Sequence, residues 1–342
     1  MRERILVREA NWVGDVVMTL PALAGIRKNF PDSKISVLIK PPLLELLEEN
    51  PAVDEIILYD SKGADSGPAG IGRVVRELRS REFHRAILFQ NAFEAAFLSF
   101  LAKIPRRMGY ATDGRGILLT DAVKVKKETR SKHQVYYYTD LLEGLGLKTD
   151  GLTPKLYLKP GDKEYASSVL KEKGIPSGGL IIGINPGAQY GIAKKWHPER
   201  FGAVADRLVK EFGARIMIFG GHGDMNTARA VQASMREEAV NMAGNTTLRQ
   251  LMALIKRCGL FITNDSGPMH ISAALKVPTL AVFGSTDPVA TGPLGKVNRV
   301  VREPVTCSPC LKRQCRYRHY QCMERVTAER VFKAAKEMLG QG

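Results

Sequence analysis

The order of hydrophobic and polar positions divides the first half of the chain into short apolar runs and longer periodic stretches. The apolar runs are typical of buried strands and predict strands at 4–8, 34–39, 55–59 and 85–89. The periodic stretches predict helices over 16–29, 43–49, 70–81, 93–103 and 134–145. Strands that alternate with helices are typical of a mainly parallel sheet covered on both faces.

The same alternation restarts in the second half of the chain. Residues 146–179 are rich in proline and glycine around one predicted helix at 162–173, as in a connecting region. Beyond it the pattern predicts strands at 180–185, 215–220, 240, 260–263 and 279–283. It predicts helices over 198–212, 225–236, 248–257, 269–275 and 326–339. We therefore expect an α/β protein with two Rossmann-like domains whose mainly parallel sheets face a central cleft.

The length of the chain supports two domains, because 342 residues are too many for one ordinary α/β core. We expect a first domain over 1–155, a linker region over 156–178, a second domain over 179–325 and a final helical segment over 326–342. In such sheets, ligands bind beyond the carboxyl ends of the strands. Clefts between domains are also favoured binding sites.

The segment Asn264–His270 lies between a predicted strand and a predicted helix and has the residues of an anion site. Asp265 or Ser266 can cap the helix, and Pro268 suits its first turn. A helix start leaves free N–H groups and the positive end of the helix dipole, which favour phosphate. A lone histidine is usually structural, but in this segment we favour a ligand contact for His270.

Three further loops follow predicted strands in the second half. The first, 185–188, precedes Lys194 and Lys195, which can meet a phosphate as point charges or form a solvated basic loop. The second ends on Asp224, which can accept hydrogen bonds from ribose or cap a helix. The third, 283–288, is another loop at a strand end. Together these loops predict a site for a phosphorylated ligand.

The loop Asn11–Asp15 follows the first predicted strand and does not match the glycine fingerprint of dinucleotide-binding domains. Asp15 stands near the start of a predicted helix. It can be an N-cap residue, or a general base at the mouth of a cleft, within reach of an acceptor hydroxyl. The position alone leaves both interpretations open.

The net charge of +16 indicates a partner or substrate that is anionic. Nucleic acid, an anionic membrane surface and a phosphorylated substrate are the usual ones, and a generally basic proteome is the alternative. Basic loops at 103–107 and 115–132 suit an acceptor rich in phosphates. They lack the interleaved aromatic residues of proteins that bind single-stranded nucleic acid.

The N-terminal segment does not resemble a signal peptide, because Glu9 and Asp15 interrupt its apolar stretch. No apolar run approaches the ~20 residues that span a bilayer. We expect a cytoplasmic protein whose membrane contact is at most peripheral.

Four of the five cysteines stand close together in the sequence. They are Cys307, Cys310, Cys315 and Cys322. Clustered cysteines in a cytoplasmic protein favour a metal over disulfides. A C-x2-C pair with two further cysteines is compatible with a structural Zn²⁺ site. The second pair is not a C-x2-C, so four free thiols are the alternative.

Taken together, these motifs resemble those of the ADP-heptose:lipopolysaccharide heptosyltransferases, glycosyltransferase family 9. The resemblance covers nearly the whole chain and is strongest at 11–15, 194–196, 265–270 and 284–288. The Cys-Ser-Pro-Cys segment is similar to that of the heptosyltransferase II sequences in this family.

The resemblance implies a GT-B fold, in which the N-terminal domain takes the acceptor and the C-terminal domain takes ADP-heptose. The final helix would cross back to the first domain. The reaction would be an inverting transfer of heptose, without a cofactor for the chemistry, to heptose I of the Kdo–lipid A inner core. The alternatives are transfer to Kdo itself, a GT-B enzyme with another nucleotide-sugar, and, remotest, a basic nucleic-acid-binding protein.

By the same resemblance, Asp15 is the catalytic base, Lys194 contacts the donor diphosphate and Asp224 lies near the ribose. The residues implied in donor binding are Lys194, Asp224, Asp265, Ser266, Gly267 and His270.

Overall fold

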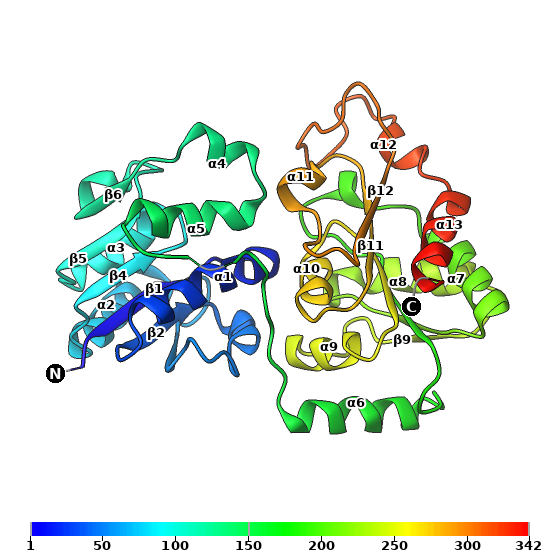
Figure 1. Ribbon diagram of the computed structural model, residues 1–342, viewed down its shortest axis with the longest axis horizontal. Helices are drawn as coiled ribbons and strands as arrows, with labels where there is room; N and C mark the ends of the chain where they lie inside the picture. Colours follow the sequence, from blue (N-terminus) through cyan, green and yellow to red (C-terminus); the bar gives the residue numbers. More distant parts are fainter. Residues whose placement is uncertain (1, 150, 341–342) are drawn as a thin grey trace. The chain divides into compact units, whose positions relative to one another are not determined.

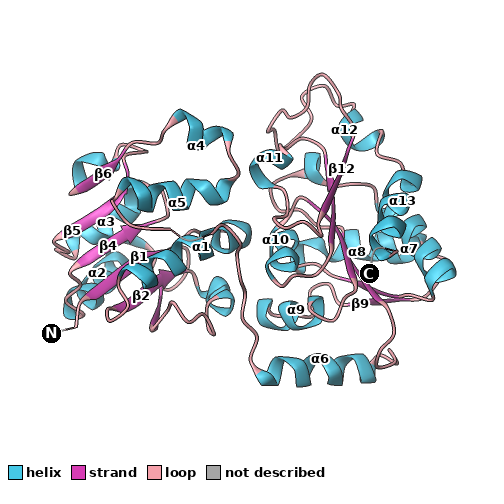
Figure 2. Ribbon diagram, viewed as in Figure 1, coloured by secondary structure: helices cyan, strands magenta, loops and turns pink. Residues whose placement is uncertain are grey.

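The computed structural model describes residues 2–149 and 151–340 and separates into two compact units, Met1–Tyr157 and Leu158–Gly342 (Figure 1). Each unit contains one six-stranded sheet, and every strand pair in both sheets is parallel. Helices surround the strands in each unit (Figure 2). The predicted α/β class is therefore confirmed.

The first sheet has the strand order β3-β2-β1-β4-β5-β6. Its strands are β1 (Arg4–Arg8), β2 (Lys34–Ile39), β3 (Glu55–Leu58), β4 (Arg85–Leu88), β5 (Arg106–Tyr110) and β6 (Asp121–Val123). Strand β1 is central, and its residues Ile5, Leu6 and Val7 are fully buried. A continuous apolar run is expected for a parallel strand that is covered on both faces.

The helices of the first unit follow the strands in alternation. They are α1 (Val13–Asn29), η1 (Pro41–Leu46), α2 (Gly67–Ser80), α3 (Phe93–Leu101), η2 (Arg115–Leu118), α4 (Lys127–Ser131) and α5 (Gln134–Gly144). Helix α1 packs against α5, and α2 packs against α3. The residues predicted as a helix at 43–49 instead form the short 3₁₀ helix η1, which begins with two prolines.

The second sheet has the strand order β12-β11-β10-β7-β8-β9. Its strands are β7 (Ile181–Asn185), β8 (Arg215–Ile218), β9 (Ala239–Asn241), β10 (Leu260–Asn264), β11 (Thr279–Phe283) and β12 (Arg299–Arg302). Read from β9, this is the order of the first sheet, with β7 in the place of β1.

The helices of the second unit include α6, which lies within the predicted linker and packs against α9. They are α6 (Pro160–Glu172), η3 (Ile192–Lys194), α7 (Pro198–Phe212), η4 (His222–Asp224), α8 (Met225–Ser234), α9 (Leu248–Ile255), α10 (Gly267–Ala274), α11 (Pro288–Thr291), α12 (Gln321–Glu324) and α13 (Ala328–Leu339). Helix α7 begins at Pro198 and ends at Gly213, whose φ of 61° is left-handed and stops the helix.

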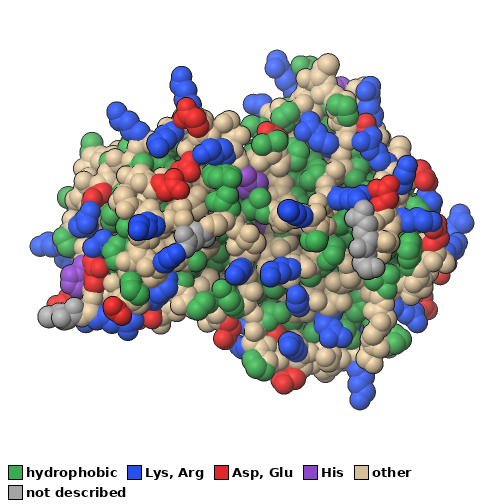
Figure 3. Space-filling model, in the orientation of Figure 1, with side chains coloured by type: hydrophobic (Ala, Val, Ile, Leu, Met, Phe, Trp, Pro, Cys, Tyr) green, Lys and Arg blue, Asp and Glu red, His purple; other side chains and the backbone are tan. Residues whose placement is uncertain are grey.

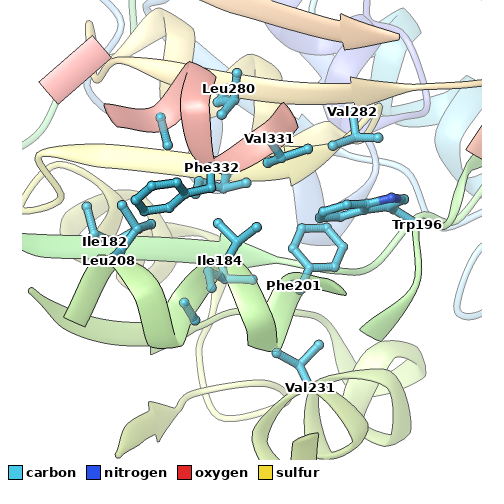
Figure 4. Close-up of a cluster of buried hydrophobic side chains, with 14 of the residues drawn as sticks. Ile182, Ile184, Trp196, Phe201, Leu208, Val231, Leu280, Val282, Val331 and Phe332 are labelled. Atoms are coloured by element: carbon cyan, nitrogen blue, oxygen red, sulfur yellow. The ribbon is translucent and has the colours of Figure 1, made fainter. Parts of the chain in front are cut away.

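The core of the second unit is formed by strands β7, β10 and β11 with α7, α8 and α13 (Figure 4). Trp196 and Phe201 are buried there edge to face, with ring centroids 4.8 Å apart, so both are packing residues. Val331 and Phe332 place the apolar face of α13 in this same core. This face contacts α7 and strands β10, β11 and β12. The packing of the final helix on the first domain stays a prediction.

Three strands were not predicted from the sequence: β5, β6 and β12. The first two lie where basic loops were expected, because Arg106 and Arg107 begin β5 and conceal its apolar positions. Arg106 forms an ion pair with Asp121 of the neighbouring β6, with 2.5 Å between the guanidinium nitrogen and the carboxylate oxygen. Strand β12 is likewise flanked by arginines at both ends.

The surface carries basic side chains over both units, interspersed with fewer acidic ones (Figure 3). Within residues 2–149 and 151–340, no helix combines the length and the apolar character that crossing a bilayer requires.

Candidate active site

Each sheet has one position from which successive strands are added in opposite directions. It lies between β1 and β4 in the first sheet and between β7 and β10 in the second. Parallel α/β sheets bind ligands beyond the carboxyl ends of the strands at such a switch point. The segment containing Asp15 follows β1. The segments 186–196 and 265–270 follow β7 and β10. These three segments therefore lie at the carboxyl edge of their own sheet.

In the second unit, two asparagines at strand ends connect these loops. Asn185, the last residue of β7, donates its side-chain amide to Thr263 Oγ1 and to Ser266 Oγ, each at 3.2 Å. Asn264, the last residue of β10, donates to the Pro186 carbonyl at 2.8 Å and accepts from the Trp196 amide at 3.1 Å. Since both asparagines are buried, these bonds hold the loops at fixed positions.

Lys194 and Asp265 form an ion pair at the centre of this edge. Lys194 Nζ lies 2.6 Å from Asp265 Oδ2, and Thr286 Oγ1 donates to the same oxygen at 2.6 Å. The Asp265 side chain is 4% exposed and that of Lys194 is 13% exposed, so water screens the pair weakly. The lysine from 194–196, the aspartate from 265–270 and the threonine from 284–288 thus come together.

Helix α10 begins directly after this aspartate. Ser266 is its N-cap residue, with Pro268 in its first turn as predicted. Among the described residues, however, the Ser266 hydroxyl forms no capping hydrogen bond with α10. It contacts Asn185 and Thr263 instead. The first N–H groups of α10 are therefore not capped by the side chain that precedes them, which is the arrangement that favours an anion. His270, one turn further on, is 7% exposed.

Asp224 lies beside the same loops. Its carboxylate is 3.6 Å from Lys195 Nζ and accepts from the Gly221 amide at 3.3 Å. Gly187 leaves room for it, since a Cβ atom at Gly187 would lie 2.6 Å from Asp224 Oδ1. The glycine of the 185–188 motif therefore allows a close approach by this carboxylate.

In the first unit, Asp15 is the third residue of α1, and Trp12 is the N-cap. The interpretation of Asp15 as an N-cap residue is therefore wrong. The predicted helix began three residues late, because Val13 and Gly14 were assigned to the preceding loop. A carboxylate in the first turn is stabilised by the positive end of the helix dipole.

Two charged residues at the end of β1 were not predicted as site residues: Arg8, the last residue of the strand, and Glu9, which follows it. Glu9 is fully buried and accepts from Thr19 Oγ1 and from the Ala10 amide, each at 2.7 Å. Burial raises the pKa of Glu9 to about 7, and the negative charge of Asp15 raises it further. The hydrogen bonds from Thr19 and Ala10 and the positive charge of Arg8 act in the opposite direction. Their signal in the sequence was a charged pair that closes an apolar strand.

Arg8, the other residue of this pair, is 1% exposed. Its guanidinium donates to the carbonyls of Glu9 and Leu38 and to Asn11 Oδ1. Burial lowers the pKa of Arg8 to about 10.

Arg115, from one of the predicted basic loops, is also buried and donates to the Tyr110 carbonyl and Asn91 Oδ1. Its pKa is lowered to about 10 by the same cause.

The four clustered cysteines are free thiols in the second unit. Cys315 Sγ accepts from backbone N–H groups of the segment 317–320, and Cys322 interacts electrostatically with the other three thiols. Within residues 2–149 and 151–340, however, no three histidine, cysteine or acidic side chains are arranged to hold a metal ion. The thiols as they stand do not form a finished metal site, so the zinc ion stays a prediction.

The chain is similar to known proteins over its full length. The model of glycosyltransferase family 9 (heptosyltransferase) matches residues 71–321. Lipopolysaccharide heptosyltransferase 2 of Salmonella typhimurium is 30% identical, over 99% of this chain and 99% of its own. Its counterpart in Escherichia coli is 30% identical, over 98% of each chain.

Two solved structures extend this similarity to the fold. The structure of E. coli ADP-heptose lps heptosyltransferase II superposes with a TM-score of 0.84 at 28% identity, covering 100% of this chain and 99% of the other. A family 9 glycosyl transferase from Veillonella parvula superposes with a TM-score of 0.90 at 28% identity, covering 99% and 98%.

Proposed function

The chain belongs to glycosyltransferase family 9, the heptosyltransferases, and we propose that it transfers L-glycero-D-manno-heptose from ADP-heptose to heptose I of the Kdo–lipid A inner core. The observation that carries this proposal is the full-length similarity to proteins named lipopolysaccharide heptosyltransferase 2. The fold of the chain is of the GT-B type, with two Rossmann-like units.

In this proposal the donor binds to the second unit. The diphosphate of ADP-heptose lies against Lys194 and the N-terminus of α10, beside Asp265, Ser266, Gly267 and His270. The buried pair of Lys194 with Asp265 supports this assignment, because Asp265 and Thr286 fix the ammonium group beside the first turn of α10. Asp224 accepts hydrogen bonds from the ribose. Its position beside Gly187 at the end of β7 supports that role.

The acceptor binds to the first unit, where Asp15 is the base. The Asp15 carboxylate takes the proton of an acceptor hydroxyl while that oxygen bonds to the anomeric carbon of heptose. The bond between this carbon and the β-phosphate oxygen breaks, and ADP leaves with the electron pair. The new bond forms on the opposite face, so the configuration inverts. Lys194 and the dipole of α10 stabilise the charge that develops on ADP, and we propose no cofactor for this step.

A transfer assay with defined acceptors tests this function. Purified protein is given ADP-heptose and truncated core acceptors with and without heptose I, and the products are identified by mass. We expect transfer only to the acceptor that carries heptose I. Transfer to an acceptor that ends in Kdo would instead identify a heptosyltransferase I activity.

The identity of the donor nucleotide is tested by binding. ADP, UDP and GDP are titrated into the protein, and we expect ADP to bind most tightly. Preferential binding of UDP or GDP would indicate another nucleotide-sugar. Tight binding of nucleic acid at physiological salt, with no nucleotide binding, would overturn the enzyme assignment.

We also propose that the protein works in the cytoplasm, at the inner face of the inner membrane, because its lipid-linked acceptor is embedded there. The net charge of +16 supports a peripheral contact with an anionic surface. Binding to vesicles that contain anionic lipid, and its loss at high salt, is the corresponding measurement.

A structural zinc ion on Cys307, Cys310, Cys315 and Cys322 is the last part of the proposal. The spacing of the cysteines and the backbone N–H groups around Cys315 support it. The thiols would have to move together to form the tetrahedral site. No step of the transfer depends on this ion.

A further inference from the structure

The segment that contains the cysteines packs on two loops of the donor site. We call residues 303–322 the cysteine loop. The amides of Cys310 and Leu311 donate to the Ser285 carbonyl at 3.1 and 2.8 Å. Ser308 Oγ donates to the Gly284 carbonyl at 2.6 Å. These acceptors directly precede Thr286, which holds Asp265. The cysteine loop is therefore fixed to the end of β11 at the ligand-binding edge.

The same loop also packs on the segment that carries Lys194. The Ala193 amide donates to the Arg313 carbonyl at 3.1 Å, and Tyr190 Oη donates to the Leu311 carbonyl at 2.9 Å. Gly191 permits this contact, because a Cβ atom there would collide with the Arg313 carbonyl oxygen and lie 2.8 Å from Arg313 Cα. The glycine before Lys194 thus provides space for the backbone of Arg313.

This packing places a second cation against the aromatic ring that Lys194 contacts. The guanidinium of Arg313 lies 5.3 Å from the centroid of the Tyr190 ring, and Lys194 Nζ lies 4.8 Å from the same centroid. The two side chains differ in their partners. Lys194 is paired with Asp265, whereas Arg313 is exposed and, among the residues that the structure describes, forms no ion pair.

We propose that Arg313 is a second cation for the donor diphosphate, and that the cysteine loop is the element that positions it. This inference rests on the proposed function, because it assigns a further contact in the same donor site. The charge of Lys194 is partly neutralised by Asp265, while ADP gains negative charge as it leaves. A guanidinium adds two parallel donors that match phosphate oxygens, which one ammonium does not offer.

The test is calorimetric titration of ADP and of adenosine into four proteins: the unaltered chain, Arg313→Ala, Arg313→Lys and Arg316→Ala. Arg316 is the matched control, an exposed arginine on the same loop whose guanidinium lies 6.0 Å from the Tyr317 ring. We expect Arg313→Ala to weaken ADP binding about tenfold or more. The Lys variant should recover part of this loss. Adenosine binding should not change in any variant.

A second variant separates the position of Arg313 from its charge. Gly191→Ala keeps the guanidinium but displaces the backbone that carries it, so it should cause the same selective loss of ADP affinity. Circular dichroism and thermal unfolding establish that each variant is folded.

Other results would overturn the inference. An Arg313→Ala variant that binds ADP within about twofold of the unaltered protein removes Arg313 from the site. Parallel losses for ADP and adenosine indicate a merely structural role. If the unaltered protein does not bind ADP at all, the proposed function fails as well, and this outcome is distinct from the other two.

Discussion

Lys194 and Asp265 form a buried ion pair 2.6 Å long between the loops that follow β7 and β10. Removing one partner from such a pair leaves the other charge buried and uncompensated, which typically costs about 3–5 kcal/mol. The pair therefore links the stability of the second unit to the geometry of its proposed donor site.

We expect Asp265→Asn to lower the free energy of unfolding by about 3 kcal/mol, because Lys194 then lacks a carboxylate. Lys194→Met should have a comparable effect, and the double variant should lose less than the sum of the two. Urea unfolding of all four proteins measures this coupling. Additive losses would show that the two residues act independently.

The proposed role of Asp15 predicts a loss of turnover without a loss of donor binding. Asp15→Asn should lower kcat by about two to four orders of magnitude, as for removal of a general base. Its affinity for ADP should be unchanged. Asp32→Asn, an exposed carboxylate beyond the end of α1, is the control. A folded Asp15→Asn protein with normal kcat would remove Asp15 from the mechanism.

The raised pKa of Glu9 predicts a specific dependence of stability on pH. The folded protein holds the Glu9 proton up to about pH 7, while the unfolded chain, with an ordinary carboxyl pKa of 4.5, releases it. The native state therefore loses stability as pH rises between these two values. Glu9→Gln keeps the hydrogen bond from Ala10 and lacks this titration.

The difference in unfolding free energy between Glu9→Gln and the unaltered protein should accordingly grow with pH in favour of the variant. From pH 4 to pH 8 the change should be on the order of 3 kcal/mol. Urea unfolding across this range measures it, with the exposed Glu49→Gln as control. Parallel stability profiles for Glu9→Gln and the unaltered protein would contradict the assignment.

The zinc prediction is tested by the metal content and the thiol reactivity of the purified protein. We expect about one zinc per chain, and its loss in Cys315→Ser. A thiol reagent should reach the cysteine loop only after chelation. Cys258 should stay unreactive throughout, because burial raises the pKa of its thiol to about 12. Zinc-free protein whose four loop thiols react at once would establish free cysteines.

Much of the fold could be predicted because strands such as 4–8 and 279–283 contain apolar runs, 5–7 and 280–283, between polar positions. The prediction failed where charge conceals a strand, as in β5. Its Arg106 pairs with Asp121 of β6, and its Arg107 donates to the carbonyls of Ile104 and Leu118. For α13, the amphipathic pattern shows which face is buried but not which surface covers it, so its packing on α7 could not be predicted from the sequence.

The loops predicted to bind the donor could be placed at one edge of the second sheet because each follows a strand. The buried pair of Arg8 and Glu9 and the position of Arg313 could not. Arg8 contacts Leu38 and Tyr59, which stand 30 residues or more further along the chain. Arg313 reaches Tyr190 only through the path of the cysteine loop. Such contacts between distant segments leave no periodic pattern.

The packing of α13 in the second unit has a consequence for exchanging parts between relatives. Each unit is one uninterrupted segment, and the chain passes between them once, at Tyr157 and Leu158. A single junction at this point is therefore enough to build chimeras. Under the proposed function, joining the first unit of one relative to the second unit of another would recombine acceptor choice with donor choice through this one junction.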